Sequence, residues 1–443
     1  MKKKWLFLLL ILPFKVNALE AIDITNESII KINEQTNNKI VDKNYKTYIN
    51  VNKDSIINIT SSKDIKGLYI IYEFKGYNGT ISYNDINANV GTNGFAHEYV
   101  TLEEITNNIT IKYEEDAIIS DIYVLSEGDI PSWVQNWNKP HEEADLLLFS
   151  THADDEQLFF LGLIPTYIDR GLKVQVAYLV HHNDNQKRIH EQLNGLWTVG
   201  EKYYPILGVI PDAYSESLDG AINNLKRVNL DEEYVIKFQT EMLRRFKPLV
   251  LVGHDEFGEY SHGQHILNTH ALKEAIKRSS DSSYYQDLNY ETWDVKKVYL
   301  HLYKDNQIIM DYYTPLQNFD GKTAYEVSKE GYKCHESQQW TWFTAWINGK
   351  NNTYTKSTDI TKYSPNIFGL YYTNVGNDIS KNDMFENVEL RKEEITDVKS
   401  EKKDTSDDIK ENKKDVKIKY YIYIISASIL LILIFSTIFK RKK

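Results

Sequence analysis

The sequence predicts an α/β protein with a Rossmann-like, mainly parallel sheet that has helices on both faces, preceded by an all-β sandwich and followed by a C-terminal transmembrane helix. Three patterns support this prediction. Strand-like and helix-like runs alternate through residues 144–388, as in parallel sheets covered by helices. Residues 19–127 contain only short β-type runs and no helical periodicity. Residues 418–439 are almost entirely apolar.

The two ends of the chain predict secretion and anchoring in a membrane. A basic and then apolar start, with small residues before a cleavage point near Ala18, indicates a signal peptide over residues 1–18. The stretch from Tyr420 to Phe439 has no charge, and at about 1.5 Å per residue it matches a hydrocarbon core of about 30 Å. The basic tail, residues 440–443, is expected to stay in the cytoplasm. We therefore expect a membrane-anchored protein whose folded part is extracellular.

Charge and cysteine content exclude two classes of function. The chain has 52 Lys and Arg residues against 63 Asp and Glu residues, a formal net charge of −11. Nucleic acid is not expected as a partner, because phosphate binding needs a basic surface. The single cysteine, Cys334, excludes an internal disulfide framework and a thiolate metal cage.

The β-type part, residues 19–127, is predicted to be a sandwich of short strands. Leu68 to Phe74 is the clearest strand, and the pairs Asn78-Gly79 and Asn93-Gly94 are typical of turns. Two interpretations stay open for this domain. Its aromatic and Asn-rich composition suits a carbohydrate-binding module, and a spacer that packs against its neighbour explains the same pattern.

A linker over residues 128–143 leads into the α/β domain, residues 144–388, and a charged stretch over residues 389–417 predicts a flexible stalk. Within the α/β domain, Leu146 to Phe149 is an unbroken apolar run typical of a strand buried on both faces. The remaining predicted strands are 174–180, 249–252 and 298–302, and the predicted helices are 157–170, kinked at Pro165, 186–199, 233–246 and 264–279.

Polar clusters follow two of these strands, at residues 151–156 and 253–265. Because the carboxyl ends of parallel strands meet at one edge of a sheet, the two clusters are expected to converge. With His152, Asp155 and His265 as ligands, a divalent metal would have two imidazoles, one carboxylate and an open position, which is typical of a catalytic zinc site. Asp154 would then be free to take a proton from water acidified by the metal. A lone histidine is more often an ordinary polar residue, so the prediction rests on the joint arrangement.

Three motifs together resemble the LmbE-like (PIG-L) family of zinc-dependent de-N-acetylases. They are His-x-Asp-Asp-Glu at 152–156, Tyr-x-His-x-x-His at 260–265 and His335-x-Ser337-Gln338. The first motif is highly specific, and the last is weak by itself. The resemblance covers residues 144–339, which is less than half of the chain.

Carried over residue by residue, the resemblance implies His152, Asp155 and His265 as metal ligands and Asp154 as general base. It gives His262 the role of steadying the oxyanion or protonating the leaving amine. Tyr260 is implied as a second donor to the carbonyl oxygen. Arg188 is implied as a substrate contact, and a place on a solvated helix face is an equal alternative for it. His335 and Gln338 are implied as structural residues. The implied cofactor is Zn²⁺, with another divalent ion such as Fe²⁺ as the alternative.

The sequence departs from the family pattern at two places. The usual proline after the first histidine is Ala153, and the usual His-Pro-Asp-His is His262-Gly263-Gln264-His265. An amide at Gln264 forms hydrogen bonds but does not stabilise an imidazolium by charge, so we expect a lower pKa for His262 than in the family.

The predicted function is that of a cell-surface zinc-dependent de-N-acetylase, a hydrolase of a linear amide. It would release acetate from an N-acetylated amino sugar of the N-acetylglucosamine type, in a glycan or a glycolipid. Two alternatives stay open. One is a surface glycan-binding protein with a weakly active or inactive deacetylase-like domain, suggested by Gln264. The other is a hydrolase of the same mechanism that acts on a different amide.

Overall fold

The computed structural model describes residues 19–339 and 354–391, and the strands and helices below all belong to one compact unit, residues 1–390. The predicted signal peptide, the predicted membrane helix at 418–439, the basic tail and nearly all of the predicted stalk lie outside the described residues. Over 19–339 and 354–391, no helix is long and apolar enough to cross a membrane. The structure therefore gives no support to the predicted C-terminal membrane helix, or to the anchored extracellular location and membrane partner that depended on it, and these predictions are withdrawn.

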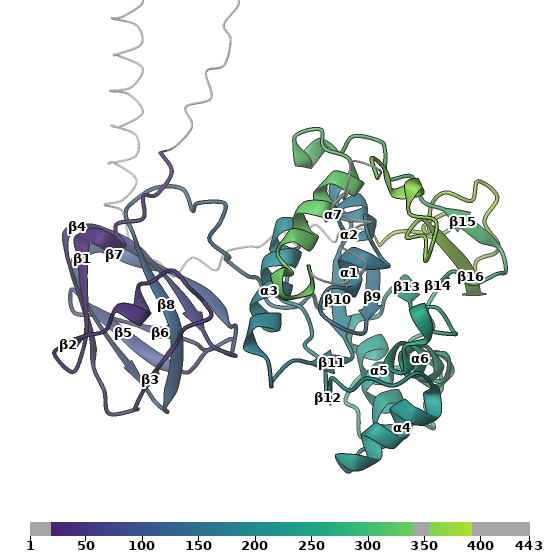
Figure 1. The fold of residues 1–443 in the computed structure, drawn as a ribbon, viewed down its shortest axis with the longest axis horizontal. Coiled ribbons are helices and arrows are strands. Elements are labelled where there is room, and N and C mark those ends of the chain that lie inside the picture. Colours follow the sequence, from purple (N-terminus) through teal and green to yellow (C-terminus); the bar gives the residue numbers. More distant parts are fainter. Residues whose placement is uncertain (1–18, 340–353, 392–443) are drawn as a thin grey trace, which may run out of the picture. The chain divides into compact units, whose positions relative to one another are not determined.

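The β region is antiparallel and forms one hydrogen-bonded sheet rather than the two separate sheets of the predicted sandwich (Figure 1). The physical reason is the length of β4, whose 16 residues pair with β1 near one end, with β8 near the other and with β7 along most of the strand. The strands are β1 Ser28–Ile32, β2 Gln35–Thr36, β3 Ile49–Val51, β4 Ile57–Tyr72, β5 Gly79–Tyr83, β6 Ile86–Val90, β7 His97–Tyr113 and β8 Ala117–Leu125.

The α/β region contains a six-stranded sheet of order β10-β9-β13-β14-β16-β15, and this sheet is mixed. Strands β9 Leu146–Ser150, β10 Val174–Tyr178, β13 Val250–Gly253 and β14 Lys297–His301 run parallel, as predicted. Strand β16, Ile367–Thr373, runs against both β14 and β15, Gln307–Ile309. The predicted fold class was therefore wrong in describing a mainly parallel sheet. Strands β14 and β15 run in the same direction on either side of β16, so β16 is the strand whose reversed direction makes the sheet mixed.

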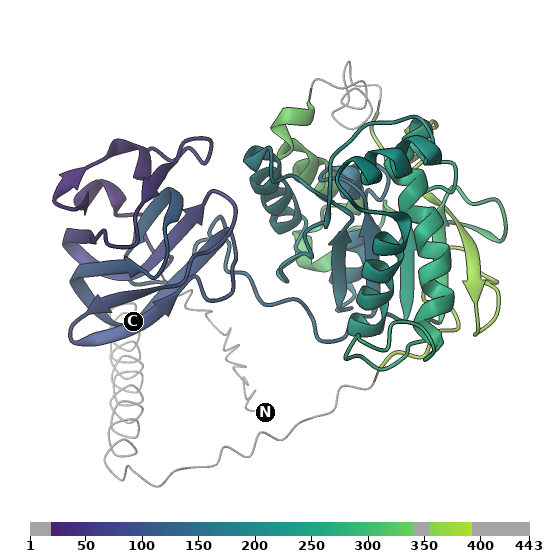
Figure 2. The ribbon, with the colours of Figure 1, turned by 90° about the horizontal axis from the view of Figure 1, so that it is seen from below.

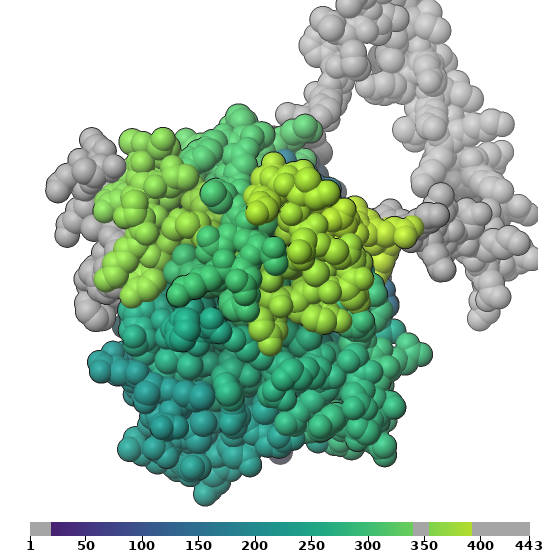
Figure 3. Space-filling model, turned by 90° about the vertical axis from the view of Figure 1, so that its right-hand side faces the viewer, coloured from purple at the N-terminus to yellow at the C-terminus, as the bar shows by residue number. Residues whose placement is uncertain are grey.

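Helices cover both faces of this sheet. Alternate side chains along the strands enter two separate cores, with Leu146 and Leu148 in one and Leu147 and Phe149 in the other. Helices α2 Leu163–Asp169, α3 Gln186–Thr198 and α7 Ala324–Lys333 contribute to the first core, and α4 Leu218–Arg227, α5 Glu232–Phe246 and α6 Gly263–Ser280 contribute to the second. The two sets flank the strands in Figures 1 and 2. In Figure 3 the last described residues, coloured yellow, pack against the green and teal segments.

The predicted helix over 157–170 is divided into α1 Asp155–Leu158 and α2. The break lies at Gly162, which has a positive φ of 82°. Pro165 causes no kink, because it lies in the first turn of α2, where the missing N–H has no helical partner to lose.

Candidate active site

The two polar clusters lie at neighbouring strand ends. Strand β9 leads into the turn 151–154, and β13 leads through the short 3-10 helix η3, Glu259–Ser261, into α6. Because β9 and β13 are hydrogen-bonded parallel neighbours, their carboxyl ends lie side by side. The structure therefore brings the two clusters together at one edge of the sheet.

Three atoms of the predicted ligand set form a nearly equilateral triangle. His152 Nδ1 lies 3.1 Å from His265 Nε2 and 3.3 Å from Asp155 Oδ2, and His265 Nε2 lies 3.2 Å from the same oxygen. All three side chains are buried. Ligands about 2.0 to 2.1 Å from a tetrahedral zinc ion are separated by about 3.3 Å, so this donor set fits such an ion.

Hydrogen bonds leave a lone pair on each of the two histidine nitrogens in that triangle. Glu259 Oε2 accepts a hydrogen bond from His265 Nδ1 at 2.7 Å, so the proton lies on Nδ1 and Nε2 is free to bind a metal. Gln264 Oε1 accepts from His152 Nε2 at 3.0 Å, which leaves Nδ1 of that ring free. Burial alone would raise the pKa of Asp155, but the neighbouring His265 and His152 hold that pKa well below its ordinary value. Asp155 is therefore an ionised oxygen donor.

Glu259 joins the ends of β13 and β14 to the start of α6. Its carboxylate, which is fully buried, accepts from His254 Nδ1 at 2.8 Å, from His265 Nδ1 and from His301 Nδ1 at 2.6 Å. His254 Nε2 in turn accepts from the backbone N–H of Thr151 at 3.0 Å. Glu259, His254 and His301 were not among the predicted site residues. His301 could have been found in the same way as the two polar clusters, because it ends β14, the parallel neighbour of β13.

Asp154 lies beside the triangle in an unusual backbone conformation, with φ 117°. Glu156 Oε2 accepts from the backbone N–H of Asp154 at 2.9 Å, and Glu156 Oε1 is 2.9 Å from His335 Nε2. Burial raises the pKa of Asp154 to about 7, although the Arg188 guanidinium acts in the opposite direction.

Arg188 does not lie on a solvated helix face. Its side chain is buried, donates to the carbonyl oxygen of Ala153 and lies 3.3 Å from Asp154 Oδ1. The residue therefore fixes the turn that carries Asp154.

His262 and Tyr260 border the same site. The His262 ring centroid lies 4.6 Å from that of His152, and Tyr260 lies 5.5 Å from both His262 and His265. His262 Nδ1 accepts from the backbone N–H of Gln264 at 3.2 Å, so the neutral ring carries its proton on Nε2. Burial, reinforced by His152 and His265, lowers the pKa of His262 to about 2. His262 is thus a neutral donor.

The Gln264 side chain forms no hydrogen bond with His262 among the described residues. Its amide instead contacts His152 Nε2 and the chain just after β12, Ile210–Pro211. Burial is the main cause of the lowered pKa of His262. The expectation of a lower pKa than in the family stays a prediction.

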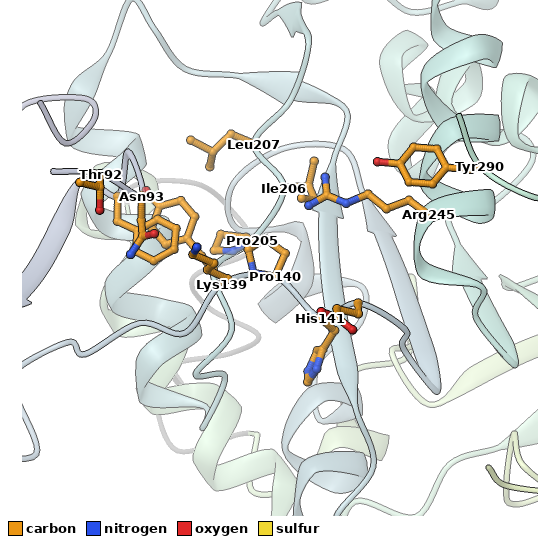
Figure 4. Close-up of a pocket in the computed structure, with 13 residues that line it drawn as sticks. Thr92, Asn93, Lys139, Pro140, His141, Pro205, Ile206, Leu207, Arg245 and Tyr290 are labelled. Carbon is orange, nitrogen blue, oxygen red and sulfur yellow. The ribbon is translucent and has the colours of Figure 1, made fainter. Parts of the chain in front are cut away.

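A hollow of about 720 Å³ lies at the amino edge of the sheet, opposite the candidate site (Figure 4). Its lining includes Lys139 to Glu142, Arg245 and Tyr290, which precede β9, β13 and β14. His141 and Glu142 are the only lining residues of metal-ligating type, and the His141 ring is stacked on Tyr203 with centroids 3.4 Å apart. This hollow therefore does not bring a metal-ligand set together, unlike the carboxyl edge of the sheet.

No family model matches the sequence. A 1D-myo-inositol 2-acetamido-2-deoxy-alpha-D-glucopyranoside deacetylase 2 from Saccharopolyspora erythraea is 41% identical over 69 residues, which is 16% of this chain and 25% of that protein. Corresponding deacetylases from Geodermatophilus obscurus and Rhodococcus jostii are 27% and 28% identical over 177 and 179 residues. Each match covers 35% of this chain, and 60% and 61% of those proteins. The chain therefore spans less than two thirds of the length of these relatives.

Among solved structures, the N,N'-diacetylchitobiose deacetylase from Pyrococcus horikoshii is 16% identical with a TM-score of 0.37, covering 53% of this chain and 86% of that one. The zinc-inhibited form of teicoplanin deacetylase Orf2 is 14% identical with a TM-score of 0.30, covering 44% and 84%. The sequence relatives confirm the predicted resemblance to the LmbE-like (PIG-L) family. They are themselves deacetylases, which is the enzyme class predicted for this chain.

Proposed function

We propose that this chain is a metal-dependent de-N-acetylase that hydrolyses the acetamide of an N-acetylated amino sugar, releasing acetate and a free amine. The substrate class is an N-acetylglucosamine-type glycan or glycolipid, in keeping with the acetamido sugar in the names of the sequence relatives. The observation that carries the proposal is the triangle of His152 Nδ1, Asp155 Oδ2 and His265 Nε2, with edges of 3.1 to 3.3 Å. We propose Zn²⁺ as the ion, because two imidazoles and one carboxylate at this spacing are a typical catalytic zinc set. Fe²⁺ suits the same donors.

The residues around the triangle have separate roles in the reaction. Asp154, with its pKa raised to about 7, accepts a proton from the attacking water and returns it to the leaving amine nitrogen as the C–N bond breaks. Neutral His262 presents Nε2–H to the acetamide oxygen, where negative charge develops, and Tyr260 is the second donor there. Arg188 and Glu156 hold Asp154 in place. A bound divalent cation would polarise the carbonyl and acidify the water.

The test measures metal content and acetate release together, using the full chain purified without chelator and offered N-acetylglucosamine oligosaccharides. We expect about one metal ion per chain, and a fall in turnover of about 10²- to 10⁴-fold in Asp154→Asn with metal content unchanged, because the variant loses only the base. Asp54→Asn, an exposed carboxylate of the β region, is the control and should match the wild-type chain.

Two outcomes would contradict the proposal. Absence of metal in the wild-type chain would remove its basis. Stoichiometric metal and oligosaccharide binding without acetate release would favour the alternative of a glycan-binding protein.

A further inference from the structure

The loop between β12 and α4, residues 212–217, is fastened to the start of α6. Gln264 Nε2 donates to the Pro211 carbonyl oxygen at 2.8 Å, and Gln264 Oε1 accepts from the Ala213 N–H at 3.1 Å. The backbone N–H of Gly263 donates to the Ser215 carbonyl oxygen at 2.7 Å. The loop is therefore held by the two residues that lie between His262 and His265.

Those two residues are the positions at which this chain departs from the usual His-Pro-Asp-His. A proline at 263 would lack the N–H that binds Ser215. Any Cβ there would overlap Ser215 Oγ and would lie 2.5 Å from the carbonyl oxygen of Ser217. A carboxylate at 264 accepts hydrogen bonds but does not donate to Pro211. Both departures thus serve one purpose, which is the close approach of this loop.

The loop places an exposed aromatic ring beside the reaction centre. Tyr214 is 62% exposed, yet its ring centroid lies 5.2 Å from that of His262 with the planes at 81°. The Tyr214 hydroxyl donates to Glu216 at 3.0 Å, and Asn224 Nδ2 lies 3.3 Å from the Tyr214 carbonyl oxygen, so both ring and backbone are held. A fixed aromatic surface that is open to solvent next to a catalytic group is typical of a ligand-binding surface.

We propose that Tyr214 is a stacking platform for a second pyranose ring, joined to the acetamido sugar whose amide is cleaved. The substrate is then an oligosaccharide or glycoconjugate rather than a single sugar. This inference deepens the proposed function and rests on it. The carbon-bound hydrogens of a pyranose face suit the electron-rich face of a tyrosine ring, whereas a free monosaccharide bound at the triangle would leave the Tyr214 ring uncovered.

The test measures binding without turnover, in full chains that carry Asp154→Asn, with chitobiose, chitotriose and N-acetylglucosamine as probes. Adding Tyr214→Ala should weaken chitotriose binding about five- to tenfold and leave binding of the monosaccharide within about twofold. Tyr214→Phe keeps the ring and should stay within about twofold for all three probes. Tyr234→Ala, which removes an exposed tyrosine of α5, is the matched control and should change nothing.

The outcomes separate the two proposals. Equal loss of monosaccharide and chitotriose binding in Tyr214→Ala, or no loss of either, would overturn the platform whether or not the wild-type chain releases acetate. A selective loss of chitotriose binding in a chain that never releases acetate would support the platform and contradict the de-N-acetylase. As a second check, Gly263→Ala should show the same selective loss, because its Cβ displaces the loop that carries Tyr214.

Discussion

The structure contains two groups of buried histidines that differ in their partners. At the carboxyl edge of the sheet, His254, His265 and His301 all donate to the carboxylate of Glu259. Elsewhere, His97 of β7 and His190 of α3 face each other at 2.8 Å, and the other nitrogen of His97 lies 2.6 Å from the Tyr69 hydroxyl. No carboxylate bonds to this second pair among the described residues.

The difference shows what makes a buried histidine suited to bind a metal. Near Asp155 and Glu259 the pKa of His265 is raised to about 10, although burial acts to lower it. Burial instead lowers the pKa of His190 to about 3 and that of His97 well below its ordinary value. A carboxylate that fixes one nitrogen directs the other toward the site and raises its basicity, and a metal binding at His265 Nε2 would displace the proton that this nitrogen holds at neutral pH. The pair at His97 lacks this partner and is a neutral packing element.

The largest effect is expected from removing the carboxylate that distinguishes the two groups. Glu259→Gln should weaken metal affinity about 10- to 100-fold, because the amide no longer enforces the Nδ1–H tautomer of His265. Competition with a chelator measures the affinity, and thermal unfolding of the metal-free chain should show a lower Tm from the buried histidines that lose their partner. Glu201→Gln, a buried glutamate that accepts a hydrogen bond from the backbone N–H of Tyr203, is the control and should leave metal affinity unchanged. Wild-type affinity in Glu259→Gln would show that the three contacts are incidental.

A second, smaller effect should appear in the pH dependence of stability. The folded pKa values of His97 and His190 lie below the ordinary value, so the unfolded chain binds protons that the folded chain excludes once pH falls below about 6.5. The free energy of unfolding should therefore fall with falling pH, by about 1.4 kcal/mol per unit for each histidine, until pH approaches the folded pKa values. His97→Gln removes one titrating group, so denaturant unfolding between pH 6 and 4.5 should show a shallower slope than for the wild-type chain. An identical slope would mean that the pair already accepts a proton in the folded state.

The sequence predicted which residues gather at the candidate site better than it predicted the hydrogen bonds between them. Side-chain type and position after a strand were sufficient to bring His152, Asp155 and His265 together, because parallel neighbours place their ends at one edge. Glu259 was not found, since nothing in its local sequence shows that imidazoles from the ends of β13 and β14 and from the start of α6 converge on one carboxylate. That convergence depends on β13 and β14 being neighbours in the sheet, which is a tertiary property.

The errors in the predicted fold have the same origin. Strand β16 reads as an ordinary β-type run, and only its pairing between β14 and β15 makes the sheet mixed. In the β region, the run from Ile57 to Tyr72 did not reveal that one bent strand would join what looked like separate sheets. The break before α2 was marked by Gly162, whose positive φ a helical pattern does not show, rather than by the more conspicuous Pro165.

The smallest expected effect comes from His152, the one member of the triangle that is oriented by an amide and not by a carboxylate. Gln264→Glu keeps an acceptor for His152 Nε2–H and adds a charge that raises the basicity of that ring, so metal affinity should rise by less than about tenfold. The same change removes the amide N–H of Gln264 that donates to the Pro211 carbonyl oxygen at 2.8 Å. Without this hydrogen bond, the loop over residues 212–217, which carries Tyr214, should loosen. Hydrogen exchange at the Ala213 N–H should therefore quicken while chelator competition shows equal or tighter metal binding. Weaker metal binding in Gln264→Glu would mean that the loop over residues 212–217, and not the hydrogen-bond partner of Nε2, holds His152 in place. A carboxylate partner would then not strengthen metal binding at His152 as it does at His265.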